Sequence, residues 1–221
     1  MASIKVFGSP TSAEVARVLT CLFEKDVEFQ LIRVDNYKGT ARKPEYLKLQ
    51  PTGQALTFED GRTTLVDSRA ICRHISERYS EQGNKELLGT GTLERASIEQ
   101  WLQTEAQSFE PPSSALVFHL AFAPLMGLET DEEVVEQSKK KLANVLDIYE
   151  QRLDETRYLA GDNFTLADLS HLPNAQRLVN TLGSAALFKQ RRRVSRWWAD
   201  ISARPSWKRV VEMQQESPAP A

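Results

Sequence analysis

Asp67 and Ser68 are the residues whose types and spacing point most directly to chemistry. They follow two short β-type runs, 55–59 and 63–66, separated by an Asp-Gly pair that strongly predicts a tight hairpin. An apolar-periodic helix begins directly after them. A carboxylate and a hydroxyl at a helix N-terminus can bind an amino-acid zwitterion, because the carboxylate takes the ammonium while the hydroxyl and the helix amides take the carboxylate. The alternative is that both residues only cap the helix.

The elements around this pair predict a β-α-β-α-β-β-α unit within about the first 80 residues. Ser12 follows the first predicted strand and opens the first predicted helix. The predicted segments are a strand at 4–7, a helix at 13–25, a strand at 27–34, a helical turn near 45–47, the hairpin, and the helix after Ser68.

The rest of the chain is predicted to be helical. A Gly-rich stretch marks the boundary, so we expect domains at 1–80 and 93–221 joined by a linker at 81–92. An apolar stripe from Leu93 should stop at Pro111-Pro112 and resume over 115–122. Capping boxes are expected at Thr130/Glu133 and Thr165/Asp168, with further helices at 194–203 and 206–213.

Composition excludes several function classes. The 221 residues are 41% hydrophobic and 26% charged with a net charge of −2, which is typical of a globular protein and gives no reason to expect a nucleic-acid partner. No apolar stretch approaches the roughly 18 residues that cross a bilayer, and the first residues lack the apolar core of a signal peptide. Cys21 and Cys72 each lie in a helical pattern rather than in a Cys-x-x-Cys pair. We interpret them as small buried thiols, which are typical of a reducing compartment. We therefore expect a cytoplasmic location and no membrane partner.

Other catalytic chemistries have little support in this sequence. His74, His119 and His171 lie in helical patterns and are interpreted as structural side chains. The chain has no Gly-x-Ser-x-Gly elbow, which disfavours a serine hydrolase. The three histidines and two cysteines show no metal-ligand spacing, so no metal is expected.

The whole pattern resembles the soluble glutathione transferases, with a thioredoxin-like α/β N-terminal domain and an all-α C-terminal domain. The resemblance continues into the second half through these segments: Gln100-Trp101-Leu102 with Glu105-Ala106, Leu159-Ala160-Gly161, Phe164-Thr165-Leu166-Ala167-Asp168, Arg196-Trp197-Trp198 and Arg204-Pro205. Lys5-Val6-Phe7-Gly8, Ser68-Arg69-Ala70-Ile71 and the position of Ser12 are similar to the plant phi class. The resemblance covers nearly the whole chain.

The resemblance implies glutathione as co-substrate and assigns Ser12 as the residue that activates its thiol. A serine hydroxyl at a helix N-terminus can donate to a thiolate, and such positions lower thiol pKa values from about 8.5 to roughly 3.5–7.5. From local sequence alone, a Thr11/Glu14 capping box is the competing interpretation of this segment. The resemblance also places Ala41 and Arg42 at the glycyl carboxylate, Gln54 and Ala55 at the cysteinyl backbone, and Asp67 with Ser68 at the γ-glutamyl end.

Several positions depart from the family pattern. Ala41 replaces a histidine, Arg42 a lysine, and Asp67 a glutamate, while Thr52 replaces an aromatic residue often used in the subunit interface. Leu56 replaces a proline that follows a cis peptide bond in the family. A cis bond before a residue other than proline costs about 2.5–4 kcal/mol, so we expect a trans bond here and weaker glutathione affinity.

Two functions are compatible with these residues. The first is conjugation of glutathione to hydrophobic electrophiles, a detoxification reaction, with a possible glutathione-dependent peroxidase activity. Phe118, His119 and Phe122 are the candidate wall of the acceptor site, although the aromatic pair can also be core. The alternative is a carrier of flavonoid-like planar ligands with little catalysis. A thiol transferase is less favoured, because those relatives have a cysteine at the position of Ser12. Family resemblance implies a homodimer.

Overall fold

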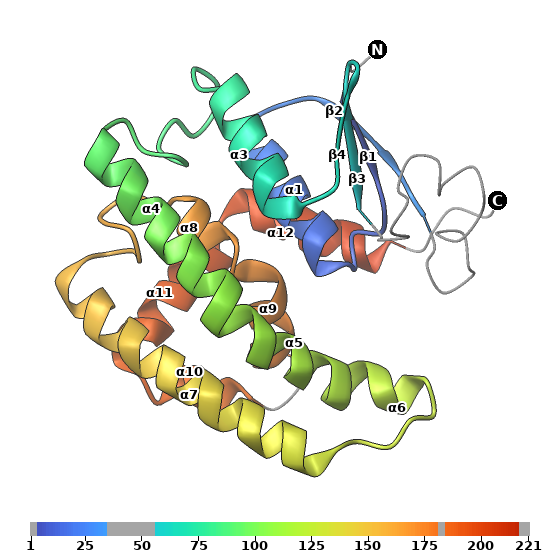
Figure 1. Cartoon of the computed structure of the whole chain (residues 1–221), viewed down its shortest axis with the longest axis vertical. Helices are drawn as coiled ribbons and strands as arrows, with labels where there is room; N and C mark the ends of the chain where they lie inside the picture. Colours follow the sequence, from blue (N-terminus) through green and yellow to red (C-terminus); the bar gives the residue numbers. More distant parts are fainter. Residues whose placement is uncertain (1–3, 35–55, 181–183, 217–221) are drawn as a thin grey trace. The chain divides into compact units, whose positions relative to one another are not determined.

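The computed structural model describes residues 4–34, 56–180 and 184–216, which belong to two compact units (Figure 1). The first unit draws on Met1–Leu87 together with Pro205–Ala221, and the second on Leu88–Arg204. The sequence analysis placed residues 205–221 in the helical domain, so the two divisions of the chain differ at its C-terminal end.

A mixed β-sheet with strand order β2-β1-β3-β4 organises the first unit. Its strands are β1 (Ile4–Phe7), β2 (Phe29–Ile32), β3 (Thr57–Asp60) and β4 (Thr63–Leu65). β1 pairs in parallel with β2 and antiparallel with β3, which puts Val6 opposite both Leu31 and Phe58. Gly61 turns the β3–β4 hairpin with a φ of 64°, a conformation that favours glycine. The predicted hairpin is confirmed.

Among the described residues of this unit, the helices beside the sheet are α1 (Ala13–Glu24), α3 (Ser68–Arg78) and α12 (Pro205–Gln215). α1 packs against both α3 and α12, so it is buried over most of its length. The Arg209 guanidinium lies 4.1 Å from the centroid of the Phe23 ring, and Ser206 donates to the Glu24 carboxylate. These pairs join residues more than 180 positions apart, which is why the order of the sequence gave no sign of them.

In its described part, the second unit contains helices joined by turns and loops, and no strand. Its α-helices are α4 (Thr92–Thr104), α5 (Glu110–Val117), α6 (Ala123–Leu125), α7 (Glu132–Glu155), α8 (Leu166–Leu169), α9 (Leu172–Asn180), α10 (Ala185–Lys189) and α11 (Arg192–Ser202). An α/β unit followed by a helical unit is the architecture that the sequence predicted.

The predicted break at Pro111-Pro112 is wrong, because the helix continues through it. Two π-helical turns, η2 (Glu105–Phe109) and η3 (Phe118–Phe122), join α4, α5 and α6 end to end. The prolines lie in the first turn of α5, directly after η2. Proline is tolerated in a first turn, where its missing N–H would have no ordinary i→i−4 partner. The change to π-helical hydrogen bonding at η2 thus accommodates both proline rings without ending the helix.

Helix caps in this unit agree only in part with the sequence. The Thr165/Asp168 capping box is confirmed, since Thr165 accepts from Ala167 and the Asp168 carboxylate accepts from the Thr165 amide. The box expected at Thr130 is wrong, because Asp131 caps α7 by accepting from the Val134 amide at 3.0 Å. In the described segments, no helix has both the length and the apolar character that a membrane span needs.

Candidate active site

Ser12 occupies the N-cap position of α1, directly after the loop that leaves β1. Its backbone is extended (φ −73°, ψ 135°), and its carbonyl accepts the first helical hydrogen bond from Ala16 at 2.9 Å. Its hydroxyl makes no capping hydrogen bond and is half-buried. The cap position belongs to Ser12 rather than Thr11, whose hydroxyl lies 2.8 Å from that of Ser9. The hydroxyl at the helix N-terminus therefore remains available to a ligand.

Asp67 is the N-cap of α3 and is exposed. Its Oδ1 accepts from the Ala70 amide at 2.6 Å, so the capping interpretation of this residue holds for one oxygen. The second carboxylate oxygen takes no part in the cap and can accept a hydrogen bond from an ammonium group. Capping and ligand binding are therefore compatible functions of this side chain.

Ser68, the first residue of α3, is only 2% exposed and is held by Arg17 from α1. The Arg17 Nη1 donates to the Ser68 Oγ over 2.7 Å, and Arg17 itself is 1% exposed. Because a guanidinium only donates, the Ser68 O–H can still donate to an anion. Arg17 also adds positive charge near the N-terminus of α3, where the helix dipole already favours a carboxylate. The sequence analysis missed this residue, although a charged side chain within the apolar run of a buried helix was the available signal.

The other residues that the resemblance assigned to glutathione lie outside the described residues. These are Ala41, Arg42, Gln54 and Ala55, together with Thr52 of the expected subunit contact. Leu56 is described, and its side chain is fully buried directly before β3. The peptide bond that precedes Leu56 includes Ala55, so its expected trans geometry stays a prediction.

Phe118, His119 and Phe122, the candidate acceptor wall, all lie on the π-turn η3 of the second unit. Phe118 is 41% exposed, while the Arg177 guanidinium lies 5.0 Å from the centroid of the Phe122 ring. His119 Nδ1 accepts from the Asp131 amide at 3.3 Å, which joins this turn to the start of α7. π-turns often occur at functional sites. Phe118 is thus the member of the set with the most exposed apolar surface.

All three histidines make hydrogen bonds within the protein, which give each of them a structural role. His74 Nε2 lies 3.1 Å from Asp60 Oδ2, and His171 lies between the Tyr149 hydroxyl and the Ala167 carbonyl, at 2.8 Å from each. His119 is bound as described above. In residues 4–34, 56–180 and 184–216, no three His, Cys, Asp or Glu side chains form a group that could hold a metal ion.

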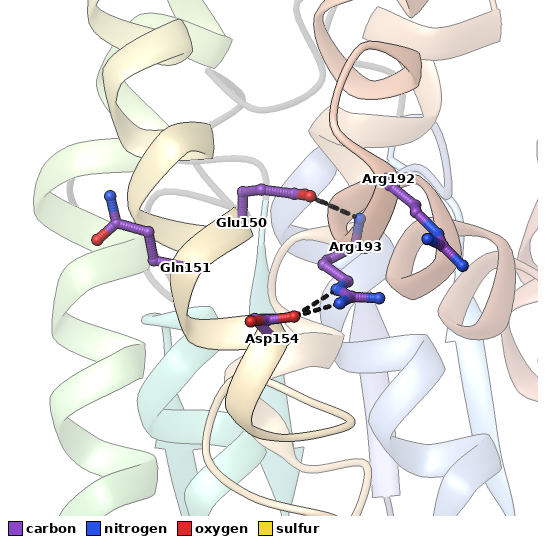
Figure 2. Close-up of a pocket in the computed structure, with 5 residues that line it drawn as sticks. All are labelled: Glu150, Gln151, Asp154, Arg192 and Arg193. Atoms are coloured by element: carbon purple, nitrogen blue, oxygen red, sulfur yellow. Dashed lines mark hydrogen bonds and ion pairs between the residues drawn. The ribbon is translucent and has the colours of Figure 1, made fainter.

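An open groove of about 350 Å³ lies between α7 and α11, but its lining is charged (Figure 2). The Glu150 carboxylate accepts from the Arg193 and Val194 amides at 2.9 Å and so caps α11. Asp154 accepts from the Arg193 Nε at 2.7 Å. These charged contacts join the two helices, and four of the five residues that line the groove carry a charge.

Comparison with known proteins identifies relatives along nearly the whole chain. Residues 2–77 match the model of the glutathione S-transferase N-terminal domain, and residues 110–205 match that of the C-terminal domain. Glutathione S-transferase F10 of Arabidopsis thaliana is 48% identical over 91% of this chain and 94% of its own.

Solved structures give the same result. Glutathione transferase F2 from Populus trichocarpa is 55% identical, with a TM-score of 0.95 over 97% of this chain and 100% of its own. Glutathione S-transferase I from mais, solved with an atrazine glutathione conjugate, is 30% identical, with a TM-score of 0.89 over 98% of this chain and 100% of its own.

Proposed function

The chain belongs to the glutathione S-transferase family, within its phi class, and from that premise we propose that it conjugates the glutathione thiolate to hydrophobic electrophiles. Glutathione is its co-substrate. The observation that carries the proposed chemistry is the Ser12 hydroxyl, which stands at the N-terminus of α1 without a capping bond.

The proposed activation step is stabilisation of the thiolate. Ser12 donates its O–H to the glutathione sulfur, the thiol proton leaves to solvent, and the N-terminal end of α1 adds positive potential. Each unit by which the thiol pKa falls corresponds to about 1.4 kcal/mol of selective thiolate stabilisation. The sulfur then bonds to the electrophilic carbon, and the leaving group departs with its electron pair. The same thiolate can attack an oxygen of a hydroperoxide, so that an S–O bond forms as the O–O bond breaks and the alcohol departs. A second glutathione thiol then displaces the hydroxyl as water and leaves glutathione disulfide, which completes the proposed peroxidase reaction.

We assign the γ-glutamyl end of glutathione to the N-terminus of α3. The second oxygen of Asp67 accepts from the ammonium, while the Ser68 O–H and the first amides of α3 donate to the carboxylate. Arg17 supports this site through its hydrogen bond to the Ser68 hydroxyl. Ala41 and Arg42 at the glycyl carboxylate, and Gln54 with Ala55 at the cysteinyl backbone, complete the proposed set.

For the acceptor we propose the apolar surface of η3, with Phe118 and Phe122 as its wall and His119 beside them. Planar hydrophobic electrophiles suit such aromatic surfaces. A homodimer in the cytoplasm belongs to the same proposal and rests on family membership.

Replacing Ser12 by Ala tests the proposal. We expect turnover with a chloronitroaromatic acceptor to fall roughly a hundredfold, as when one hydrogen-bond donor to a developing anion is removed. The matched control is Thr11→Ala, which removes a neighbouring hydroxyl of the same loop and should leave turnover within about twofold.

Unchanged turnover in Ser12→Ala, with the fold intact by circular dichroism, would remove Ser12 from its assigned role. A wild-type protein without glutathione-dependent turnover that still binds planar dyes would favour the carrier function instead.

A further inference from the structure

The loop that delivers Ser12 to the start of α1 is attached at its first residue to the end of β2. The Gly8 amide donates to the Ile32 carbonyl at 3.0 Å, and the Gly8 carbonyl accepts from the Val34 amide at 3.5 Å. At its other end, the Ser12 amide donates to the Ser9 carbonyl at 2.9 Å and closes a turn. The Gly8 bonds fix the start of the loop, whereas the Ser9–Ser12 bond lies within the loop and leaves the turn that contains Pro10 to be positioned by other contacts.

Gln214 holds the middle of that loop from the other end of the chain. Its Nε2 donates to the Pro10 carbonyl at 2.9 Å, across 204 positions of sequence. Pro10 is buried and has no N–H of its own, so its carbonyl is its only backbone hydrogen-bonding group. Gln214 is half-buried in the last turn of α12, whereas its neighbour Gln215 is exposed.

The last turn of α12 is itself fixed to the strand that holds Gly8. Arg33 donates to the Met213 carbonyl at 3.2 Å and to the Glu216 carbonyl at 3.1 Å, and it also pairs with the Glu216 carboxylate at 3.1 Å. The last carbonyls of a helix lack intrahelical partners, so a guanidinium satisfies them well. Arg33 directly precedes Val34, which bonds Gly8. The turn of α12 that carries Gln214 is therefore attached to the end of β2, which also holds the first residue of the Ser12 loop.

We infer that Gln214 is a positioning residue for Ser12, so that the C-terminal helix sets the geometry of thiolate stabilisation. This inference rests on the proposed function, because it concerns the hydroxyl assigned there to the sulfur. Pro10 lies within the turn that the Ser9–Ser12 bond closes, so a displacement of this turn would move the Ser12 Oγ relative to the bound sulfur. Displacements of about 1 Å in a reacting pair can cost roughly a hundredfold in rate.

The test compares Gln214→Met, which removes the donor at similar length, with Gln214→Lys, which restores a donor. Gln215→Met is the matched control on the same turn. We expect Gln214→Met to lower kcat for a chloronitroaromatic acceptor about tenfold and to raise the pKa of enzyme-bound glutathione, measured by thiolate absorbance in the ultraviolet. The KM for glutathione should change less than about twofold, because Asp67 and Ser68 are untouched. Gln214→Lys should recover most of the loss.

Three outcomes would overturn the inference while leaving the proposed function intact: a Gln214→Met protein as active as Gln215→Met, a bound-thiol pKa equal to that of wild type, or a loss that Gln214→Lys does not recover. Absence of glutathione turnover and of thiolate absorbance in the wild type would instead remove the proposed function. Circular dichroism and thermal unfolding of each variant separate a local change in geometry from loss of the fold.

Discussion

The buried pair of Arg17 and Ser68 shows how one side chain prepares a binding site that it does not itself enter. Arg17 lies on α1 and Ser68 on α3, yet their 2.7 Å hydrogen bond makes the N-terminus of α3 more positive and orients the Ser68 hydroxyl. A hydrogen bond to a charged group contributes roughly 1.5–3 kcal/mol. Part of that stabilisation is available to a bound carboxylate.

Arg17→Met should therefore weaken glutathione binding more than it slows the chemical step. We expect the KM for glutathione to rise about tenfold with kcat within about threefold of wild type, since the γ-glutamyl end is remote from the sulfur. Steady-state kinetics over a range of glutathione concentrations measures both constants. Because Arg17 is fully buried, Arg17→Lys serves as the variant that keeps the charge. A fall confined to kcat in both variants would contradict the assignment of this pair to the γ-glutamyl site.

Residue-level prediction from sequence succeeded where the signal was local. The Asp67 cap and the Thr165 cap each follow from a polar side chain at the start of an apolar-periodic helix. The sequence gave no indication of the partners of Arg17 and Gln214, because these lie 51 and 204 positions away. Only folding brings these pairs together.

At the scale of elements, the capping box at Thr165 organises a buried helix junction of the second unit. The Asp168 carboxylate accepts from Leu159 N at 3.1 Å, from Trp197 Nε1 at 2.8 Å and from Thr165 N at 3.1 Å. One side chain thus joins the segment before α8 to α11. The sequence predicted the local part of this network but not the bond from Trp197.

Thr165→Ala should destabilise the fold by roughly 1 kcal/mol, the usual cost of losing an N-cap side chain. The hydroxyl that accepts from Ala167 is removed, while the backbone bond from Thr165 to Asp168 remains. Denaturant titration measures the free energy of unfolding. Thr165→Ser retains the hydroxyl and is the control; equal losses in the two variants would show that the methyl group, rather than the cap, matters.

The prediction of a helix boundary failed where the helix continues through a change in its backbone hydrogen-bonding pattern. Pro111-Pro112 predicts a break in an ordinary α-helix, but η2 shifts the frame before the prolines and the helix continues. Nothing in the residue types around Glu105 marks a π-turn. The sequence analysis placed α12 with the helical domain, whereas the contacts group it with the first unit, because it packs against α1.

For the molecule as a whole, the buried Asp168 should give folding a distinctive dependence on pH. Burial raises the pKa of its carboxyl from 3.8 to about 6, although its hydrogen bonds from Leu159, Trp197 and Thr165 favour the ionised form. The folded protein therefore binds this proton more tightly than the unfolded chain does. The stabilising contribution is fully present below about pH 4 and is lost as the pH rises through 6. A shift of about two units corresponds to about 3 kcal/mol in total.

Asp168→Asn isolates this effect from the other carboxylates, because the variant cannot ionise at this position. The substitution has its own cost, since the amide cannot accept every bond that Asp168 accepts, but that cost does not vary with pH. We expect the free energy of unfolding of wild type minus that of the variant to fall by about 2 kcal/mol between pH 4.5 and pH 7. Denaturant titrations at several pH values measure this difference. A difference that stays constant, or that grows as the pH rises, would mean that the hydrogen bonds to Asp168 outweigh its burial and hold its pKa near or below the ordinary value.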